Sequence, residues 1–204
     1  MEKFIVSLLW RLLDALYEDF GAALVTAILF MFLYMAVKKA GIKNVARQWI
    51  DKFKHDKSFR RIFFLTFFSA FILFRTVFCR NVSGWPLQHI RGTWGLYNSD
   101  GRVNVEGAAN VVLFIPLTML VYWALSDKIF GRFKKSFINI LWISTVISFC
   151  ISLGIELCQL FLKVGQFQLS DIAFNTLGGI IGGVLYYIIH KIKKHSTGKN
   201  THAE

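Results

Sequence analysis

Long apolar runs separated by short polar segments make up most of the chain. A helix needs about 20 apolar residues to cross a bilayer, so runs of this length predict membrane spans rather than the core helices of a soluble domain. We expect five spans, over residues 21–37, 62–78, 107–125, 137–162 and 172–190. The predicted fold class is therefore all-α, a polytopic transmembrane helical bundle.

The first 20 residues follow a different pattern. Ser7, Arg11, Asp14 and Glu18 recur at helical spacing on one narrow face, and apolar side chains cover the rest. This pattern predicts an N-terminal amphipathic helix over residues 2–20 that lies at the membrane surface or packs on the bundle.

Composition and charge agree with a membrane protein. The chain is 55% hydrophobic with a mean hydropathy of +0.50, which is too apolar for an ordinary soluble domain. The net charge of +12 comes from lysines and arginines between the apolar runs, with no groove-reading motif beside them. We therefore predict no nucleic-acid binding, and expect the basic loops to lie beside anionic membrane lipids.

The loops fall into two groups by charge. Residues 38–61, the loop near residues 128–135 and the tail after residue 190 are basic, whereas residues 80–106 are nearly balanced and contain Trp85 and Trp94. Basic loops favour the cytoplasm, so we expect a multi-pass cell-membrane protein with its N-terminus outside and its C-terminus in the cytoplasm. A re-entrant first span stays open as an alternative because that run is short.

These features divide the chain into three regions. Residues 1–60 hold the amphipathic helix, the first span and a basic cytoplasmic loop, and residues 61–190 form a four-helix membrane domain. Residues 191–204 form a basic cytoplasmic tail.

Two apolar helices joined by a short polar turn, within residues 144–183, carry polar groups that an ordinary span would avoid. The first helix has one polar stripe: Thr145, Ser148, Ser152, Glu156, Gln159 and Lys163. The second has another: Asp171, Asn175, Gly178 and Gly182. A charged group inside a bilayer costs about 2.5–3.5 kcal/mol on insertion scales, so such groups face the bundle interior and mark function.

The expected topology brings a set of polar residues to similar depth near the outer ends of the spans. They are Arg75, Glu106, Asn110, Glu156, Gln159, Asp171 and Asn175. We expect a convergent polar pocket that opens to the outside.

Three interpretations of this pocket stay open. It is a satisfied internal network, in which Arg75 pairs with Glu156 or Glu106. Alternatively it is a substrate site, with Glu156 and Asp171 as catalytic base and acid, Arg75 holding an anionic headgroup and the other members binding substrate. In the third, oxygens of Glu156, Asp171, Asn110 and Asn175 bind a hard cation such as Mg²⁺ or Ca²⁺. Residue spacing alone does not choose among them.

The glycines, cysteines and histidines say less about the function of the pocket. Gly178 with Gly182, and Gly179 with Gly183, form two small-residue seams, for which we expect close helix packing. The three cysteines predict no disulfide framework, and the scattered histidines predict no histidine-based metal site. The sequence identifies neither a cofactor nor an oligomeric state.

Several blocks, in order, resemble the VanZ-like membrane proteins. The opening half carries Arg75-Thr76, Trp85-Pro86-Leu87 and Glu106-xxx-Asn110 followed by Val-Val-Leu-Phe-Ile-Pro116. The closing half carries Ser152-xxx-Glu156-Leu-xx-Gln159, then Ser170-Asp171-xxx-Asn175-Thr-Leu-Gly-Gly179. The resemblance covers about residues 65–190 and leaves those before about 60 as additions. The family often has an arginine before Asp171, where this chain has Gln166 and Lys163 nearby.

The resemblance implies a bacterial cell-envelope protein. The family takes its name from a member associated with resistance to teicoplanin, a lipoglycopeptide antibiotic that carries an acyl chain. The outward-facing pocket expected from the topology suits this association, because it could bind or modify an amphiphilic envelope molecule, such as a lipid-linked wall precursor, or a lipoglycopeptide in the outer leaflet. An ion- or proton-coupled transporter, with Glu156 as the titrating group, and a non-catalytic membrane scaffold are the alternatives, so whether the protein is an enzyme stays open.

Overall fold

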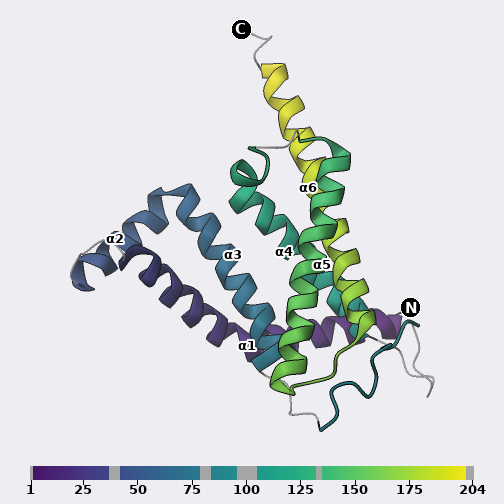
Figure 1. Ribbon diagram of the computed structural model, residues 1–204. Helices are drawn as coiled ribbons and strands as arrows, with labels where there is room; N and C mark the ends of the chain where they lie inside the picture. Colours follow the sequence, from purple (N-terminus) through teal and green to yellow (C-terminus); the bar gives the residue numbers. More distant parts are fainter. Residues whose placement is uncertain (1, 37–41, 79–83, 96–104, 132–134, 201–204) are drawn as a thin grey trace.

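A computed structural model describes residues 2–36, 42–78, 84–95, 105–131 and 135–200, which form six α-helices and one π-helix (Figure 1). The α-helices are α1 (Glu2–Ala36), α2 (Ile42–His55), α3 (Lys57–Leu73), α4 (Glu106–Ile129), α5 (Phe137–Leu162) and α6 (Leu169–Asn200). The π-helix η1 (Phe74–Phe78) follows α3 directly. The predicted all-helical class is confirmed.

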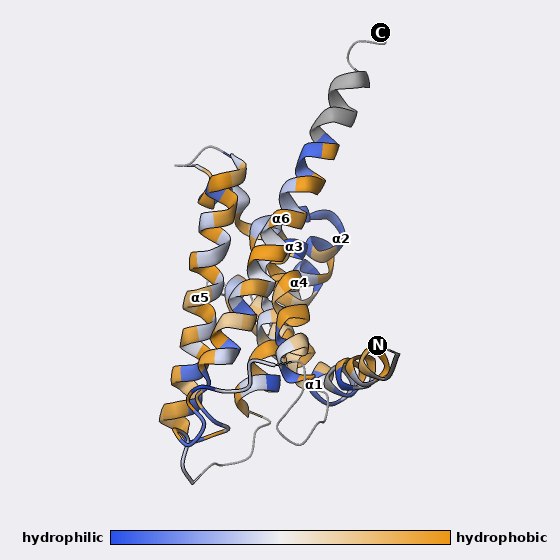
Figure 2. Cartoon of the chain, turned by 90° about the vertical axis from the view of Figure 1, so that its right-hand side faces the viewer, coloured by the Kyte–Doolittle hydropathy of each residue, from blue (hydrophilic) through white to orange (hydrophobic). Residues whose placement is uncertain are grey.

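Five segments of the described helices are long and apolar enough to cross a membrane, as predicted. They are Tyr17–Met35, Lys57–Phe78, Glu106–Ile129, Phe137–Leu162 and Leu169–Lys193. Figure 2 shows hydrophobic residues along the middle of these helices and hydrophilic residues on α2 and toward the helix ends. The protein is therefore a multi-pass membrane protein.

The spans form two groups. α4 and α5 both pack on α6, whereas α1 packs on α3, and contacts between α3 and α4 join the groups. In Figure 1 the α1–α3 pair leans away from α4, α5 and α6 toward the end where α2 lies.

The bundle has two chemically different ends. We call the end where α5 meets α6, and where η1 ends and α4 begins, the hairpin end. The opposite end, where α3 and α5 begin and α4 ends, is the basic end. Lysines and arginines at this end include Lys57, Arg60 and Arg61 of α3, Lys128 of α4, Lys135 just before α5, and Lys191 and Lys193 of α6.

α1 combines the predicted amphipathic helix and first span in one continuous helix. Its N-terminal part lies across the hairpin end, and the rest rises toward α2 (Figure 1). Arg11 reaches the start of α4, where its Nη1 donates to Glu106 Oε1 at 3.3 Å. Trp10 is 63% exposed and Leu13 is 54% exposed, as expected for side chains that meet lipid at a membrane surface.

α2 corrects one expectation, because residues 38–61 were predicted to be a basic loop. Val45, Trp49 and Phe53 recur every four residues, so they share one face and pack against α1 and α3. The Trp49 ring stacks on Phe53 at 5.3 Å and meets Phe63 of α3 edge-on at 5.9 Å. The many basic residues of this segment hid an amphipathic helix. Asp56 then caps α3 by accepting from the backbone N–H groups of Ser58 and Phe59.

Glycines bring α6 against the backbone of α4. A Cβ added at Gly178 would collide with the carbonyl oxygen of Val111, and one at Gly182 with that of Ile115. Both helices run from the hairpin end to the basic end, so the contacts repeat every four residues along a parallel pair. The predicted close-packing seam is confirmed on this face.

A second glycine face of α6 meets serines of α5. A Cβ at Gly179 would collide with Ser148, and one at Gly183 with Ser144. α5 runs antiparallel to α6, so a step of plus four residues on α6, from Gly179 to Gly183, corresponds to a step of minus four on α5, from Ser148 to Ser144. This register continues toward the hairpin end, where the candidate site lies.

Candidate polar site at the hairpin end

The polar stripe of α5 is buried against the rest of the bundle. Its members with at most 1% exposure are Ser144, Ser148, Ser152, Glu156 and Gln159. Ser144 was not singled out from the sequence, and Thr145 instead lies beside the stripe, where its hydroxyl donates to the Leu141 carbonyl at 2.9 Å. Lys163 is exposed in the left-handed conformation that ends α5, so it does not belong to the stripe.

The antiparallel register of α5 and α6 places the two site carboxylates at one level. One layer beyond the Gly179–Ser148 contact, Asn175 Nδ2 donates to Ser152 Oγ at 2.9 Å. Four residues further along α5 and four residues back along α6, Glu156 and Asp171 therefore lie at the same height in the helix pair. Both residues are buried, at 1% and 8% exposure.

Glu156 holds the connection between the two helices. Its Oε2 accepts a hydrogen bond of 2.8 Å from the backbone N–H of Gln168, the residue just before α6. The start of a helix carries unpaired N–H groups and a partial positive charge, which favours a carboxylate at this place. The buried carboxylate therefore fixes the turn from which the next span begins.

Gln159 links α5 to the π-helix. Its Nε2 donates to the backbone carbonyl of Thr76 at 2.7 Å. Gln159 Oε1 and Asn175 Oδ1 are buried and have no hydrogen-bond partner within the described part of the chain. Buried polar atoms are usually paired, so these two oxygens can accept hydrogen bonds from a ligand or from water.

The remaining predicted members lie around this group rather than in it. Glu106 is at the expected end of α4, but its side chain is 63% exposed and faces Arg11 of α1. Arg75 is half-buried in η1, next to Thr76. Within the described residues it pairs with neither Glu156 nor Glu106, the partners of the internal-network interpretation. Asn110 is half-buried on α4, one helical turn beyond Glu106.

Residues 84–95, between the second and third spans, cover the α5–α6 turn, and we call them the covering segment. The backbone N–H of Phe167 donates to the Pro86 carbonyl at 2.9 Å, and that of Leu169 donates to the Ile90 carbonyl at 2.8 Å. Gly92 completes a turn in this segment at φ +66, and Ser170 lies where a side chain would project. The covering segment is thus attached to the turn that Glu156 holds.

A polar cavity of about 560 Å³ lies between this segment and the turn. Its polar side chains are Gln88, His89, Arg91, Thr93, Gln166 and Gln168. Gln168 connects the cavity to the buried polar group, because it lines the cavity while its backbone N–H donates to Glu156. Helical periodicity cannot place residues of irregular segments, so the sequence signalled only that Arg91 lies in a tryptophan-bearing loop.

Asp19 is a buried carboxylate that the sequence did not bring forward. It is 1% exposed, and neither of its side-chain oxygens has a hydrogen-bond partner in the described ranges. The spacing Asp19, Ala23, Ala27, Met31 marks the buried face of α1, and this pattern is the signal that could have found it.

Two further observations concern metals and other hollows. The described residues hold no group of three or more His, Cys, Asp or Glu side chains that could bind a metal ion.

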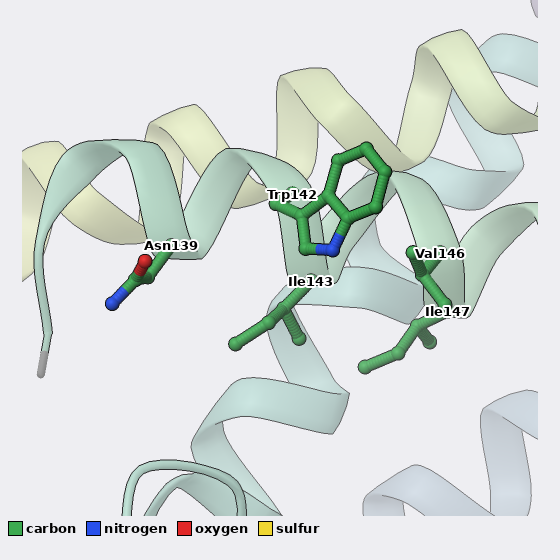
Figure 3. Close-up of a pocket in the computed structure, with 5 residues that line it drawn as sticks. All are labelled: Asn139, Trp142, Ile143, Val146 and Ile147. Carbon is green, nitrogen blue, oxygen red and sulfur yellow. The ribbon is translucent and has the colours of Figure 1, made fainter. Parts of the chain in front are cut away.

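A hollow of about 220 Å³ on α5 is formed by Asn139, Trp142, Ile143, Val146 and Ile147, which all come from that helix (Figure 3). Trp142 is 69% exposed, so this largely apolar hollow near the start of α5 matches a lipid-facing surface and is separate from the polar site.

Comparison with known families places most of the membrane part of the chain in one family. The chain matches the VanZ/LLP1 family over residues 23–190. It belongs to the VanZ/LLP1 family. No curated protein and no solved structure matches the chain significantly.

The match also changes the expected extent of the VanZ/LLP1 pattern. It begins at residue 23, inside the first span, so the expectation that residues before about 60 are additions is wrong for residues 23–60, whereas the N-terminal amphipathic part lies outside the match. The polar blocks that carried the resemblance begin near residue 65. The first span has few such polar residues, which is why it was not recognised as part of the family.

Proposed function

We propose that this VanZ/LLP1 protein binds or modifies an amphiphilic molecule of the bacterial cell envelope at its hairpin end. The observation that carries the proposal is the contact between Glu156 and Gln168. It links a carboxylate buried among the spans to a polar cavity large enough for part of a small molecule. Charged groups buried in a membrane bundle usually mark function.

The proposal includes an orientation in which the hairpin end faces outward. Lysines and arginines gather at the opposite end, and such residues favour the cytoplasm. Trp85 and Trp94 of the covering segment are 79% and 60% exposed, as suits residues at a membrane interface. The molecule bound at this site would then come from the outer leaflet or from outside the cell.

The residues of the site have complementary tasks in this proposal. Arg91 at the cavity holds an anionic group, a task for which Arg75 was the expected residue. The unpaired oxygens of Gln159 and Asn175 are buried and do not line the cavity, so they would accept hydrogen bonds from a part of the ligand, or from water, that enters between the helices. In a modifying reaction, Glu156 and Asp171 would serve as base and acid. The ligand's acyl chain stays in the bilayer beside the bundle.

A proton-coupled transporter is the second candidate, and Asp19 favours it. Asp19 is buried inside the first span, and ionisable residues inside spans mark ion pathways and proton relays. Uptake of a solute that follows an imposed pH gradient, and that Asp19→Asn abolishes, would favour this function over a binding or modifying site.

Antibiotic susceptibility in a sensitive Gram-positive host tests the first proposal. We expect the wild-type chain to raise the inhibitory concentration of teicoplanin several-fold and to leave that of vancomycin, which lacks the acyl chain, unchanged. Glu156→Gln and Asp171→Asn should abolish the protection at matched membrane levels, because each removes a site carboxylate with little change in size.

Cys158→Ala is the matched control, since Cys158 is exposed on the same helix as Glu156. It should protect as well as wild type. Protection that survives both carboxylate substitutions would assign Glu156 and Asp171 to packing alone. No protection from the wild-type chain would contradict a role in resistance to this class of drug.

A further inference from the structure

A second cavity opens at the basic end of the bundle, far from the hairpin site. It has a volume of about 620 Å³ and is bordered by residues of α3, α4 and α6, together with Lys135, which lies just before α5. We call it the basic-end groove. Its lining joins α3 of the one group of spans to α4 and α6 of the other.

The groove is apolar at its deep end. Pro116, Met119 and Leu120 of α4 line this part, and Ile189 of α6 adds to the apolar lining. At a rise of about 1.5 Å per residue, the α4 wall from Pro116 to Asp127 is roughly 16 Å long. The hydrocarbon core of a bilayer is about 30 Å thick, so this length corresponds to one leaflet. The deep part therefore suits an acyl chain.

Cationic side chains from different elements meet at the mouth of the groove. Arg61 comes from the start of α3, Lys135 precedes α5, and Lys193 lies toward the end of α6, with Asp127 as the acidic member of the lining. His190 adds a further ring nitrogen donor or acceptor. A ligand that fits this mouth carries negative charge.

Arg61 gives a second, independent sign of an anionic ligand. Its guanidinium lies over the Trp123 ring, 5.6 Å from the ring centre, which fixes its position at the groove. Its Nε is buried and has no hydrogen-bond partner in the part of the chain that the structure describes. An arginine presents a planar fork of donors that matches phosphate oxygens, and here one donor still lacks an acceptor.

We propose that the basic-end groove binds an anionic phospholipid of the surrounding leaflet. The phosphate lies between Arg61 and Lys135, and one acyl chain follows the α4 wall toward Pro116. The bound lipid fills the space between α3 and α6 and thereby holds the two groups of spans together. This site does not depend on the function proposed for the hairpin end.

Native mass spectrometry of the full chain in a neutral detergent tests this proposal. The probes are phosphatidylglycerol, phosphatidylcholine with the same acyl chains, and glycerol 3-phosphate. We expect one phosphatidylglycerol to bind in preference to phosphatidylcholine, and glycerol 3-phosphate not to displace it. The double variant Arg61→Gln/Lys135→Gln should weaken phosphatidylglycerol binding roughly 30-fold, since each cation near a membrane surface strengthens such binding several-fold.

The control is Lys57→Gln/Lys191→Gln, which removes the same charge from the same end but from residues that do not line the groove. It should keep the preference for phosphatidylglycerol. Equal binding of the two lipids to the wild-type chain would overturn the proposal. An equal loss of binding in the control variant would also overturn it, because the lipid would then respond to the total charge of this end rather than to the groove. Displacement by glycerol 3-phosphate would overturn it as well, because the site would then not bind an acyl chain.

Discussion

Replacing Gly178 or Gly182 by alanine is expected to disrupt the α4–α6 pair and to destabilise the protein by about 3 kcal/mol, the upper end of the usual range for overpacking. The added Cβ would collide with the Val111 or Ile115 carbonyl oxygen. A backbone atom cannot rotate away as a side chain can, so the two helices must separate along their length. Thermal unfolding of the purified protein in detergent measures the effect, with the fraction of monodisperse protein as a second readout.

Gly154→Ala is the matched control for these variants. Gly154 lies on α5, and a Cβ there meets nothing within 4 Å. Alanine is the better helix former, so this variant should be as stable as wild type or more stable by about 0.5–1 kcal/mol. Wild-type stability of Gly178→Ala and Gly182→Ala would mean that α4 and α6 do not pack as closely as described.

The second large effect is expected for Glu156→Ala. It removes the acceptor of the Gln168 N–H and leaves a half-buried donor unpaired, which should cost about 2 kcal/mol because the lost hydrogen bond is charge-assisted. Amide hydrogen exchange should accelerate over residues 163–170, where the turn loses its anchor. Glu156→Gln keeps an acceptor oxygen at the same place and should lose clearly less.

The control for Glu156→Ala is Cys158→Ala, which truncates an exposed side chain on the same helix. It should leave the exchange of residues 163–170 unchanged. If Glu156→Ala also left this exchange unchanged, the carboxylate would not hold the turn, and the link between the buried acid and the polar cavity would be lost.

These two effects are connected through the register of α5 and α6. The glycine–serine contacts at Gly179 and Gly183 set the distance and the offset of the two helices. The same offset places Asp171 level with Glu156 and brings Asn175 within 2.9 Å of Ser152. Small residues toward the basic end of the bundle therefore determine which polar groups meet at the hairpin end.

The spans could be predicted because bilayer thickness imposes a length on apolar runs. The polar stripe of α5 could be predicted because an i, i+4 repeat of polar residues in an apolar helix has one buried face. α2 was missed because its amphipathic pattern is short and its three core residues lie among many charges. The repeat of Val45, Trp49 and Phe53 every four residues marks its buried face, and it was outweighed by the basic residues around it.

Depth in the membrane could be inferred from topology, but the direction of a side chain could not. Glu106 lies at the expected end of α4, yet it faces Arg11 because the N-terminal part of α1 crosses that end. Arg75 sits in a π-helix, whose wider turn departs from the 3.6-residue period used to assign its face. The cavity residues His89 and Arg91 lie in an irregular segment, where no period applies.

The central claim is that the hairpin-end site opens to the outside of the cell, and cysteine labelling in intact cells tests it most directly. His89→Cys at the polar cavity and Lys191→Cys at the basic end are placed separately in a chain whose Cys79, Cys150 and Cys158 are replaced by alanine. Both positions are exposed. We predict that a membrane-impermeant maleimide labels His89→Cys in intact cells and labels Lys191→Cys only after permeabilisation. Labelling of Lys191→Cys in intact cells, with His89→Cys protected until permeabilisation, would contradict the account.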